Sequence, residues 1–128
     1  MCQMEIRCLI VDDSPRFAQT AVELLADEGI DVVGVAAGGE EAVRLARELR
    51  PDLALVDIDL GDESGLDIAS RLCTSGPGGL VRTVILISTH AEEQFSELIA
   101  ASPAVGFLAK ADLCADAIMT LLSQPARE

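Results

Sequence analysis

Four aspartates fall in two short acidic stretches that could bind a metal ion and accept a phosphoryl group. Asp12 and Asp13 follow an apolar run in VDDSP, and Asp57 and Asp59 lie in LALVDIDLGDES. Carboxylate oxygens are preferred ligands of hard cations such as Mg²⁺. A carboxylate is also a nucleophile that can form an acyl phosphate. These residue types indicate phosphoryl-transfer chemistry, provided that the fold brings the two stretches together.

Hydroxyl and ammonium groups elsewhere in the chain could complete such a site. Ser88 and Thr89 end the apolar run VILIST, and Lys110 ends GFLAK. Phosphoryl transfer needs little beyond alignment and neutralisation of three equatorial oxygens. The metal ion would take one oxygen, the Lys110 ammonium a second, and the Ser88 hydroxyl with a backbone N–H a third. Taken singly, each of these residues is equally typical of a strand end, a turn or a solvated surface.

Short apolar runs alternate with helical patterns along the chain, and these elements must position the polar residues. Continuous apolar runs predict strands at 7–11, 31–37, 52–57, 83–88 and 104–109. Helical spacing predicts helices at 17–29, 39–51, 64–73, 91–101 and 112–123. Asp13 or Ser14 could cap the first helix, with Pro15 at its first position. Five successive βα units with fully apolar strands predict a doubly wound α/β fold, a parallel sheet with helices on both faces.

The carboxyl ends of the strands in such a sheet lie at one edge. The fold would therefore bring Asp12, Asp13, Asp57, Ser88 and Lys110 to the same edge. Nearby carboxylates repel one another, and without compensation at least one would have its pKa raised and take up a proton. A divalent cation relieves this repulsion. Mg²⁺ fits best, with Mn²⁺ as the alternative, because no soft ligand for zinc accompanies the acids.

Composition limits the classes of function open to the chain. Its 128 residues favour one domain, which we place at 1–123, followed by a tail or linker start at 124–128. A net charge of −13 opposes direct DNA binding. No apolar run is long enough to cross a bilayer and no leader pattern is present, so we expect a cytoplasmic protein without membrane contact. The four cysteines lack zinc spacing, and Cys8 is expected to be a reduced packing residue.

From Glu5 to about Ser123 the chain resembles a response-regulator receiver domain of two-component signalling. The acidic pair in VDDSP, the acceptor strand in LALVDIDLGDESG, the hydroxyl in VILIST and the lysine in GFLAK fall where that family has them. Gly65, eight residues after Asp57, also matches the family pattern. The resemblance implies that Asp57 is phosphorylated by a phosphohistidine on a sensor histidine kinase.

The same resemblance implies how the metal and the strands are arranged. Asp13, Asp57 and the backbone carbonyl of Asp59 would hold Mg²⁺, while Asp12 would act largely through water. The strand order would be the flavodoxin-like 2-1-3-4-5 of this family.

The family also implies a switch. Phe107 precedes Lys110 by three residues, where receivers carry a Tyr or Phe that turns inward when the Ser or Thr hydroxyl moves. A buried aromatic there is equally what a core needs. Phosphorylation would alter the face formed by 91–101, 104–109 and 112–123, which we expect to be a partner or homodimer surface. GFLAKADL resembles receivers attached to a helix-turn-helix domain, so transcription regulation and DNA binding would belong to an output domain outside this chain.

Several positions depart from the family pattern or vary within it. Asp59 and His90 fall at two variable positions that influence hydrolysis of the phosphoaspartate, and we expect them to tune its lifetime. His90 is equally typical of a solvent-facing helix start. Thr89 stands where a very small residue is usual, so it would narrow access to the phosphoryl group. Gly61 replaces a common Pro, which would loosen the loop that holds Asp59. Ala111 replaces the Pro that often follows the lysine, so no cis peptide bond is expected there.

Other classes of protein share parts of this pattern. VDIDL also resembles the D-x-D start of haloacid dehalogenase-like phosphotransferases, although these usually carry it on their first strand and are longer. DIDLGDESG resembles a calcium loop, but it follows a strand and lacks the Glu at the twelfth position of an EF-hand. A third alternative is a receiver-like interaction module that is never phosphorylated. We expect a phosphoacceptor signalling domain, which assists only its own phosphorylation and dephosphorylation, in place of a turnover enzyme.

Overall fold

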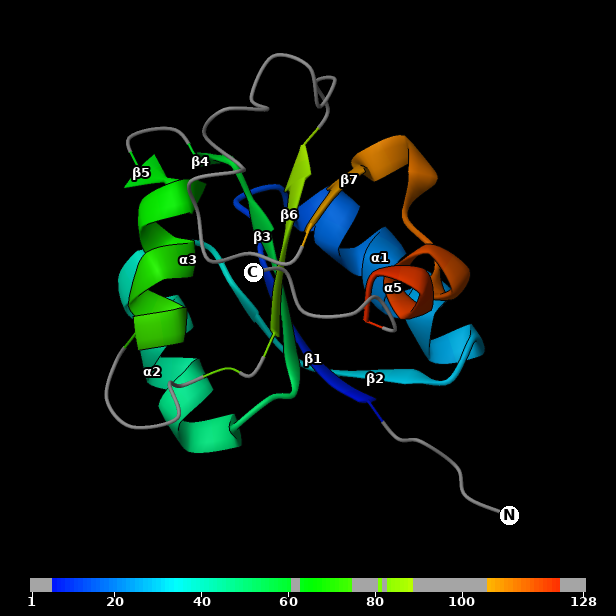
Figure 1. Ribbon diagram of the computed structural model, residues 1–128, viewed down its shortest axis with the longest axis horizontal. Helices are drawn as coiled ribbons and strands as arrows, with labels where there is room; N and C mark the ends of the chain where they lie inside the picture. The colour runs from blue at the N-terminus through cyan, green and yellow to red at the C-terminus, as the bar shows by residue number, and fades with distance from the viewer. Residues whose placement is uncertain (1–5, 61–62, 75–80, 82, 89–105, 123–128) are drawn as a thin grey trace.

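The computed structural model describes residues 6–60, 63–74, 81, 83–88 and 106–122, which form a parallel sheet between two helical layers (Figure 1). The five strands of the sheet run in the order β2-β1-β3-β6-β7 and pair in parallel throughout. Their bounds are β1 Ile6–Val11, β2 Ile30–Ala36, β3 Leu53–Asp57, β6 Thr83–Ser88 and β7 Gly106–Ala109. This confirms the doubly wound α/β fold and its 2-1-3-4-5 order.

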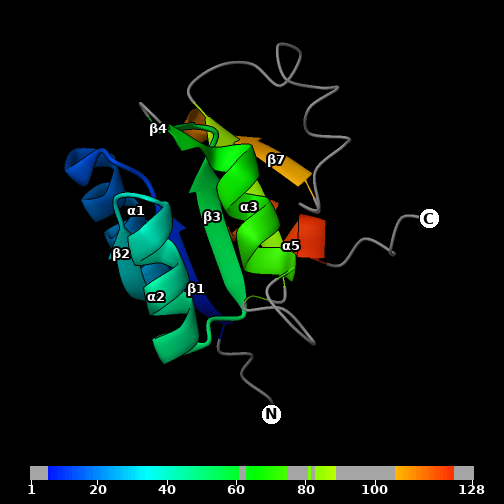
Figure 2. The same ribbon diagram turned by 90° about the vertical axis from the view of Figure 1, so that its left-hand side faces the viewer.

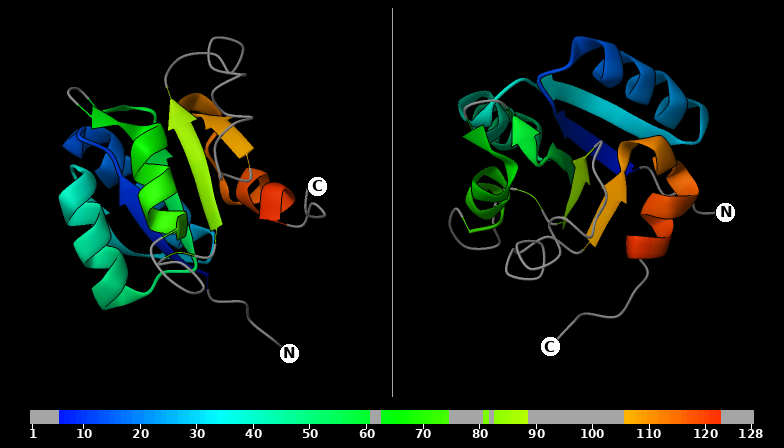
Figure 3. Two further views of the ribbon diagram at one scale, coloured as in Figure 1. Left: turned by 60° about the vertical axis from the view of Figure 1, so that its left-hand side comes forward. Right: turned by 90° about the horizontal axis from the view of Figure 1, so that it is seen from above.

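Helices cover both faces of the sheet, and Figure 2 shows α2 and α3 in front of it. Their bounds are α1 Pro15–Asp27, α2 Gly39–Leu49, α3 Gly65–Thr74 and α5 Ala115–Leu122. The view from above in Figure 3 places α1 and α5 on one side of the strands and α2 and α3 on the other. None of the helices within the described ranges is long and apolar enough to span a membrane.

Alternate residues of the central strands enter two separate cores, which explains why these strands are apolar throughout. Leu9 and Val11 of β1 belong to the core beneath α2 and α3, whereas Cys8 and Ile10 belong to the core beneath α1 and α5. Cys8 is fully buried, as expected for a packing residue. Because both faces are covered, polar side chains are confined largely to the strand ends.

The helix boundaries differ from the predicted ones for local reasons. The first helix begins at Pro15, two residues earlier than predicted, and it ends before Gly29. Gly29 has a positive φ of 92°, which is unfavourable for a residue with a side chain. The helix predicted at 112–123 begins only at Ala115, because residues Lys110–Asp112 form a 3-10 turn. The second helix stops at Leu49 because Arg50 adopts a left-handed conformation with φ of 50°. No cis peptide bond occurs in the described part of the chain.

A short antiparallel hairpin follows β3 and was not predicted. It joins β4 Asp59–Leu60 to β5 Glu63–Ser64, and α3 starts immediately afterwards at Gly65. Ser64 therefore belongs to a strand and not to the predicted helix 64–73, which runs from Gly65 to Thr74. The helix predicted at 91–101, the start of the strand predicted at 104–109 and the tail 124–128 lie outside the described residues.

Candidate functional site

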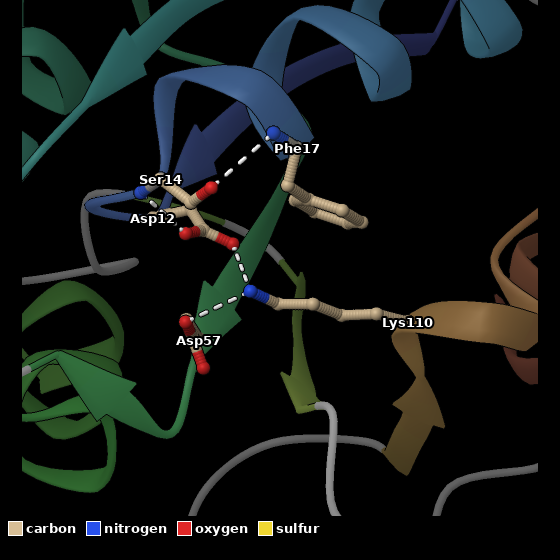
Figure 4. A network of polar contacts seen from close by, with 5 residues as sticks. All are labelled: Asp12, Ser14, Phe17, Asp57 and Lys110. Carbon is tan, nitrogen blue, oxygen red and sulfur yellow. Dashed lines mark hydrogen bonds and ion pairs between the residues drawn. The ribbon is translucent and has the colours of Figure 1, made fainter.

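Three polar residues from distant parts of the chain converge at the carboxyl edge of the sheet (Figure 4). Asp12 follows β1, Asp57 ends β3, and Lys110 follows β7. The Lys110 Nζ atom lies 2.6 Å from Asp12 Oδ2 and donates a hydrogen bond to Asp57 Oδ2 at 3.1 Å. The convergence predicted for these three residues is therefore present in the fold.

Asp12 is fixed by the start of α1. Its backbone N–H donates to the Ala36 carbonyl at 2.9 Å, and its Oδ1 accepts a hydrogen bond from the Ser14 N–H at 2.8 Å. The Ser14 hydroxyl in turn accepts from the Phe17 N–H at 3.3 Å, so Ser14 is the cap of this helix. Pro15 at the first helical position is suited to this turn. The buried Asp12 carboxylate is thus held with Oδ2 directed at Lys110.

The acidic residues fit a small hard cation. One carboxylate oxygen from each of Asp12, Asp13 and Asp57 lies within 4.8 Å of the other two. Asp12 and Asp57 are buried, whereas Asp13 is exposed, so the cluster is open to solvent on one side. The Oδ2 atom of Asp12 is buried, and the Lys110 ammonium is its close neighbour. This all-oxygen donor set with an open side is suited to Mg²⁺, which retains several waters.

Lys110 supplies positive charge within the acidic cluster. Burial by itself lowers the pKa of Lys110, but the hydrogen bonds that Lys110 donates to Asp12 and Asp57, together with the charges of these carboxylates, outweigh this effect, so the pKa is raised above its usual value of 10.5. The ammonium also lies 4.4 Å from the centre of the Phe17 ring. Because it contacts two of the carboxylates, Lys110 already relieves part of their repulsion. A metal ion is therefore not the sole means of compensating the acids.

The structure describes some of the remaining predicted site residues and not others. Ser88 ends β6 and is fully buried, and the preceding residue pairs with Asp57. Phe107 is half-buried in β7 and packs against the core beneath α2 and α3. The backbone of Asp59 begins β4 directly beyond the acceptor strand. Thr89 and His90 lie outside the described residues.

Two features of the site were not anticipated from the sequence. Phe17 was assigned only to a helical pattern, yet its ring contacts the Lys110 ammonium. Gly65 packs directly on the acceptor strand, where its N–H donates to the Ile58 carbonyl at 2.9 Å. A Cβ at Gly65 would lie 2.7 Å from Ile58 Cα and nearer still to the Asp57 carbonyl oxygen. The matching family position of Gly65 was the only signal for this contact.

Comparison with known proteins assigns the chain to a family. The model of the response regulator receiver domain matches residues 8–120. The chain belongs to that family. The receiver is 34% identical over 106 residues to the response regulator GacA of Pseudomonas aeruginosa, a match that covers 82% of this chain and 48% of GacA. The receiver thus spans about half the length of this curated relative.

Solved structures support the same assignment. The receiver domain of a NarL response regulator from Mycobacterium tuberculosis superposes with a TM-score of 0.79 at 26% identity, covering 94% of this chain and 98% of that one. A response regulator from Burkholderia pseudomallei has a TM-score of 0.77 at 26% identity, covering 93% and 67%. That protein is described with a phosphorylated aspartic acid, a calcium ion and citrate. Family membership distinguishes the receiver from the haloacid dehalogenase-like phosphotransferases.

Proposed function

We propose that this receiver accepts a phosphoryl group on Asp57 from a phosphohistidine of a sensor histidine kinase. The observation that supports it most strongly is the Lys110 ammonium 2.6 Å from Asp12 Oδ2 and 3.1 Å from Asp57 Oδ2, beside a third carboxylate. An ammonium shared by two buried carboxylates at a strand edge is suited to neutralising a third anionic group that arrives there.

The transfer step is balanced with no further reactant besides water. A carboxylate oxygen of Asp57 attacks phosphorus and the P–N bond to the kinase imidazole breaks; the imidazole nitrogen keeps the electron pair of that bond and takes up a proton from water. The product is an acyl phosphate on Asp57. Lys110 would neutralise one phosphoryl oxygen, and the buried Ser88 hydroxyl at the end of β6 would donate to another.

The carboxylates of Asp12, Asp13 and Asp57 would hold a divalent cation, with the backbone carbonyl of Asp59 as a further ligand. Mg²⁺, or Mn²⁺ in its place, would supply positive charge for the phosphoryl oxygens. The B. pseudomallei relative, described with a phosphorylated aspartic acid and a calcium ion, supports a phosphorylated, cation-binding role for this chain.

Phosphorylation would act on the face that contains β7 and α5. We assign Phe107 as the aromatic residue that responds to the Ser88 hydroxyl, with Thr89 limiting access and His90 and Asp59 tuning the lifetime of the phosphoryl group. The face would serve a partner or a second copy of the chain. Any effect on transcription would act through an output domain outside this chain, because the net charge of −13 opposes DNA binding here.

Phosphorylation by a small donor tests the proposal directly. The purified chain is incubated with acetyl phosphate and Mg²⁺, and its intact mass is measured over time. We expect the mass of one phosphoryl group in the wild type, none in Asp57→Asn, and none when EDTA removes the metal. A wild type that gains no mass, or an Asp57→Asn variant that gains as much, would overturn the proposal. Phosphomonoesters should release no sustained phosphate, which separates a phosphoacceptor from a turnover enzyme.

A further inference from the structure

Among the described residues, three groups lie close to the Lys110 ammonium, and phosphorylation would affect each of them differently. Two are the carboxylates of Asp12 and Asp57. The third is the Phe17 ring, whose centre lies 4.4 Å from Nζ. Both carboxylates belong to the acidic cluster that would bind the cation, and Asp57 is also the proposed nucleophile. The ring is a neutral partner that neither the cation nor the phosphoryl group would recruit.

We propose that Phe17 is a positioning residue. Its ring holds the Lys110 ammonium at the acidic cluster when Asp12 and Asp57 bind the cation and the phosphoryl group. This role rests on the proposed phosphorylation of Asp57. A cation over an aromatic face is attracted by the ring quadrupole, and more strongly where water is excluded. The Lys110 side chain is only 12% exposed, so the attraction is weakly screened.

The start of α1 fixes the Phe17 ring relative to the Asp12 carboxylate. The Phe17 N–H donates to the Ser14 hydroxyl at 3.3 Å, and the Ser14 N–H donates to Asp12 Oδ1 at 2.8 Å. Asp12 Oδ2 lies 2.6 Å from Lys110 Nζ, which lies over the ring. The contact with the ring closes these interactions into a loop, of which Figure 4 marks the hydrogen bonds and the ion pair with dashed lines. The start of α1 therefore sets the ring and the carboxylate together relative to the ammonium.

A packing role alone is the competing explanation, because Phe17 also contacts the core beneath α1 and α5. The two roles differ in their dependence on ring electrons. Fluorine substitution withdraws electrons from the ring face and weakens its attraction for a cation, while it leaves the shape of the side chain nearly unchanged. Cyclohexylalanine keeps the volume and removes the aromatic face entirely.

The phosphorylation rate is therefore measured with phenylalanine analogues of increasing fluorination at position 17, with cyclohexylalanine, and with Phe17→Leu. Acetyl phosphate and Mg²⁺ are the probes, and urea unfolding monitors the fold. We expect the rate to fall stepwise with fluorination and by about tenfold with cyclohexylalanine. Val22→Ala is the matched control, since Val22 packs against the same core from the same helix. It should lower stability and leave the rate unchanged.

A second readout follows the ammonium without any phosphorylation. Lys110 is the single lysine of the sequence, so lysine-selective isotope labelling gives one set of side-chain NMR signals. The ring should shift the signals of the Lys110 side-chain protons, and the shift should disappear in Phe17→Leu and persist in Val22→Ala.

The outcomes separate the two proposals. A phosphorylated wild type whose rate is the same across the fluorinated series overturns the positioning role alone. Lys110 signals that are unchanged in Phe17→Leu overturn it as well, because the ring then does not lie over the ammonium in solution. If the wild type gains no phosphoryl group, the proposed function is overturned, and the positioning role of Phe17 is overturned with it.

Discussion

Replacing Gly65 with alanine should disturb the acceptor strand more than any comparable glycine substitution in the described part of the chain. A Cβ at Gly65 would lie 2.7 Å from both Ile58 Cα and the Asp57 carbonyl carbon, and nearer still to the carbonyl oxygen. These neighbours are backbone atoms, so the strand or the start of α3 must move. Overpacking of this kind costs about 1–3 kcal/mol. Loss of the hydrogen bond from the Gly65 N–H to Ile58 adds about 1 kcal/mol.

We therefore expect Gly65→Ala to lower the free energy of unfolding by about 3 kcal/mol. The sequence contains no tryptophan or tyrosine, so far-UV circular dichroism in urea is the suitable measurement. The same displacement moves Asp57 relative to Lys110 and the other acids. Because a shift near 1 Å can slow a positioned reaction about 100-fold, phosphorylation by acetyl phosphate should slow by roughly 10- to 100-fold.

Gly29→Ala provides a control that lowers stability without a clash, at a smaller cost. Gly29 has a φ of 92° and no atom within 4 Å of its would-be Cβ, so alanine there introduces backbone strain without a clash. The strain costs about 1–2 kcal/mol. Gly29 precedes β2 at the edge of the sheet opposite the acids, so this variant should be phosphorylated at the wild-type rate. If Gly65→Ala matched the wild type in both stability and rate, the close approach inferred for Gly65 would be refuted.

Two further predictions concern buried charge and the buried thiol. Lys110→Met should lower the free energy of unfolding in metal-free buffer by about 3 kcal/mol, because two buried carboxylates lose their cation. Mg²⁺ should stabilise this variant more than the wild type. Equal responses of the two proteins to Mg²⁺ in urea unfolding would contradict this. Since the Lys110 pKa is raised above 10.5, its stabilisation is fully present at lower pH and is lost only as the pH rises through the raised value, where the two proteins should converge. Burial raises the pKa of the Cys8 thiol to about 12 from 9.0, which lowers its thiolate fraction near pH 8 about a thousandfold. Peptide mapping after iodoacetamide treatment should find Cys8 modified only in urea and the partly exposed Cys114 modified in the native state. Rapid modification of Cys8 in the native protein would contradict this and would show that the core beneath α1 and α5 opens readily.

The sequence predicts the site well where the parallel sheet determines position. Asp12, Asp57 and Lys110 follow three different strands, and the rule that carboxyl ends share an edge is enough to bring them together. The hairpin 59–64 escaped prediction because each of its strands has two residues, too few to show a periodicity. The contact of Phe17 escaped because helical spacing assigns a residue to a face, whereas its partner depends on the distance between α1 and the turn after β7.

Lys110 explains how the acidic cluster can exist in the absence of a metal ion. Two carboxylates at this edge are buried, and each is in contact with the same ammonium. A cation that binds Asp12, Asp13 and Asp57 would add positive charge close to Lys110, and the two would repel each other. An incoming phosphoryl group supplies negative charge that relieves this repulsion. Under the proposed function, metal binding and phosphorylation of Asp57 should therefore favour each other, in part through their shared neighbour Lys110.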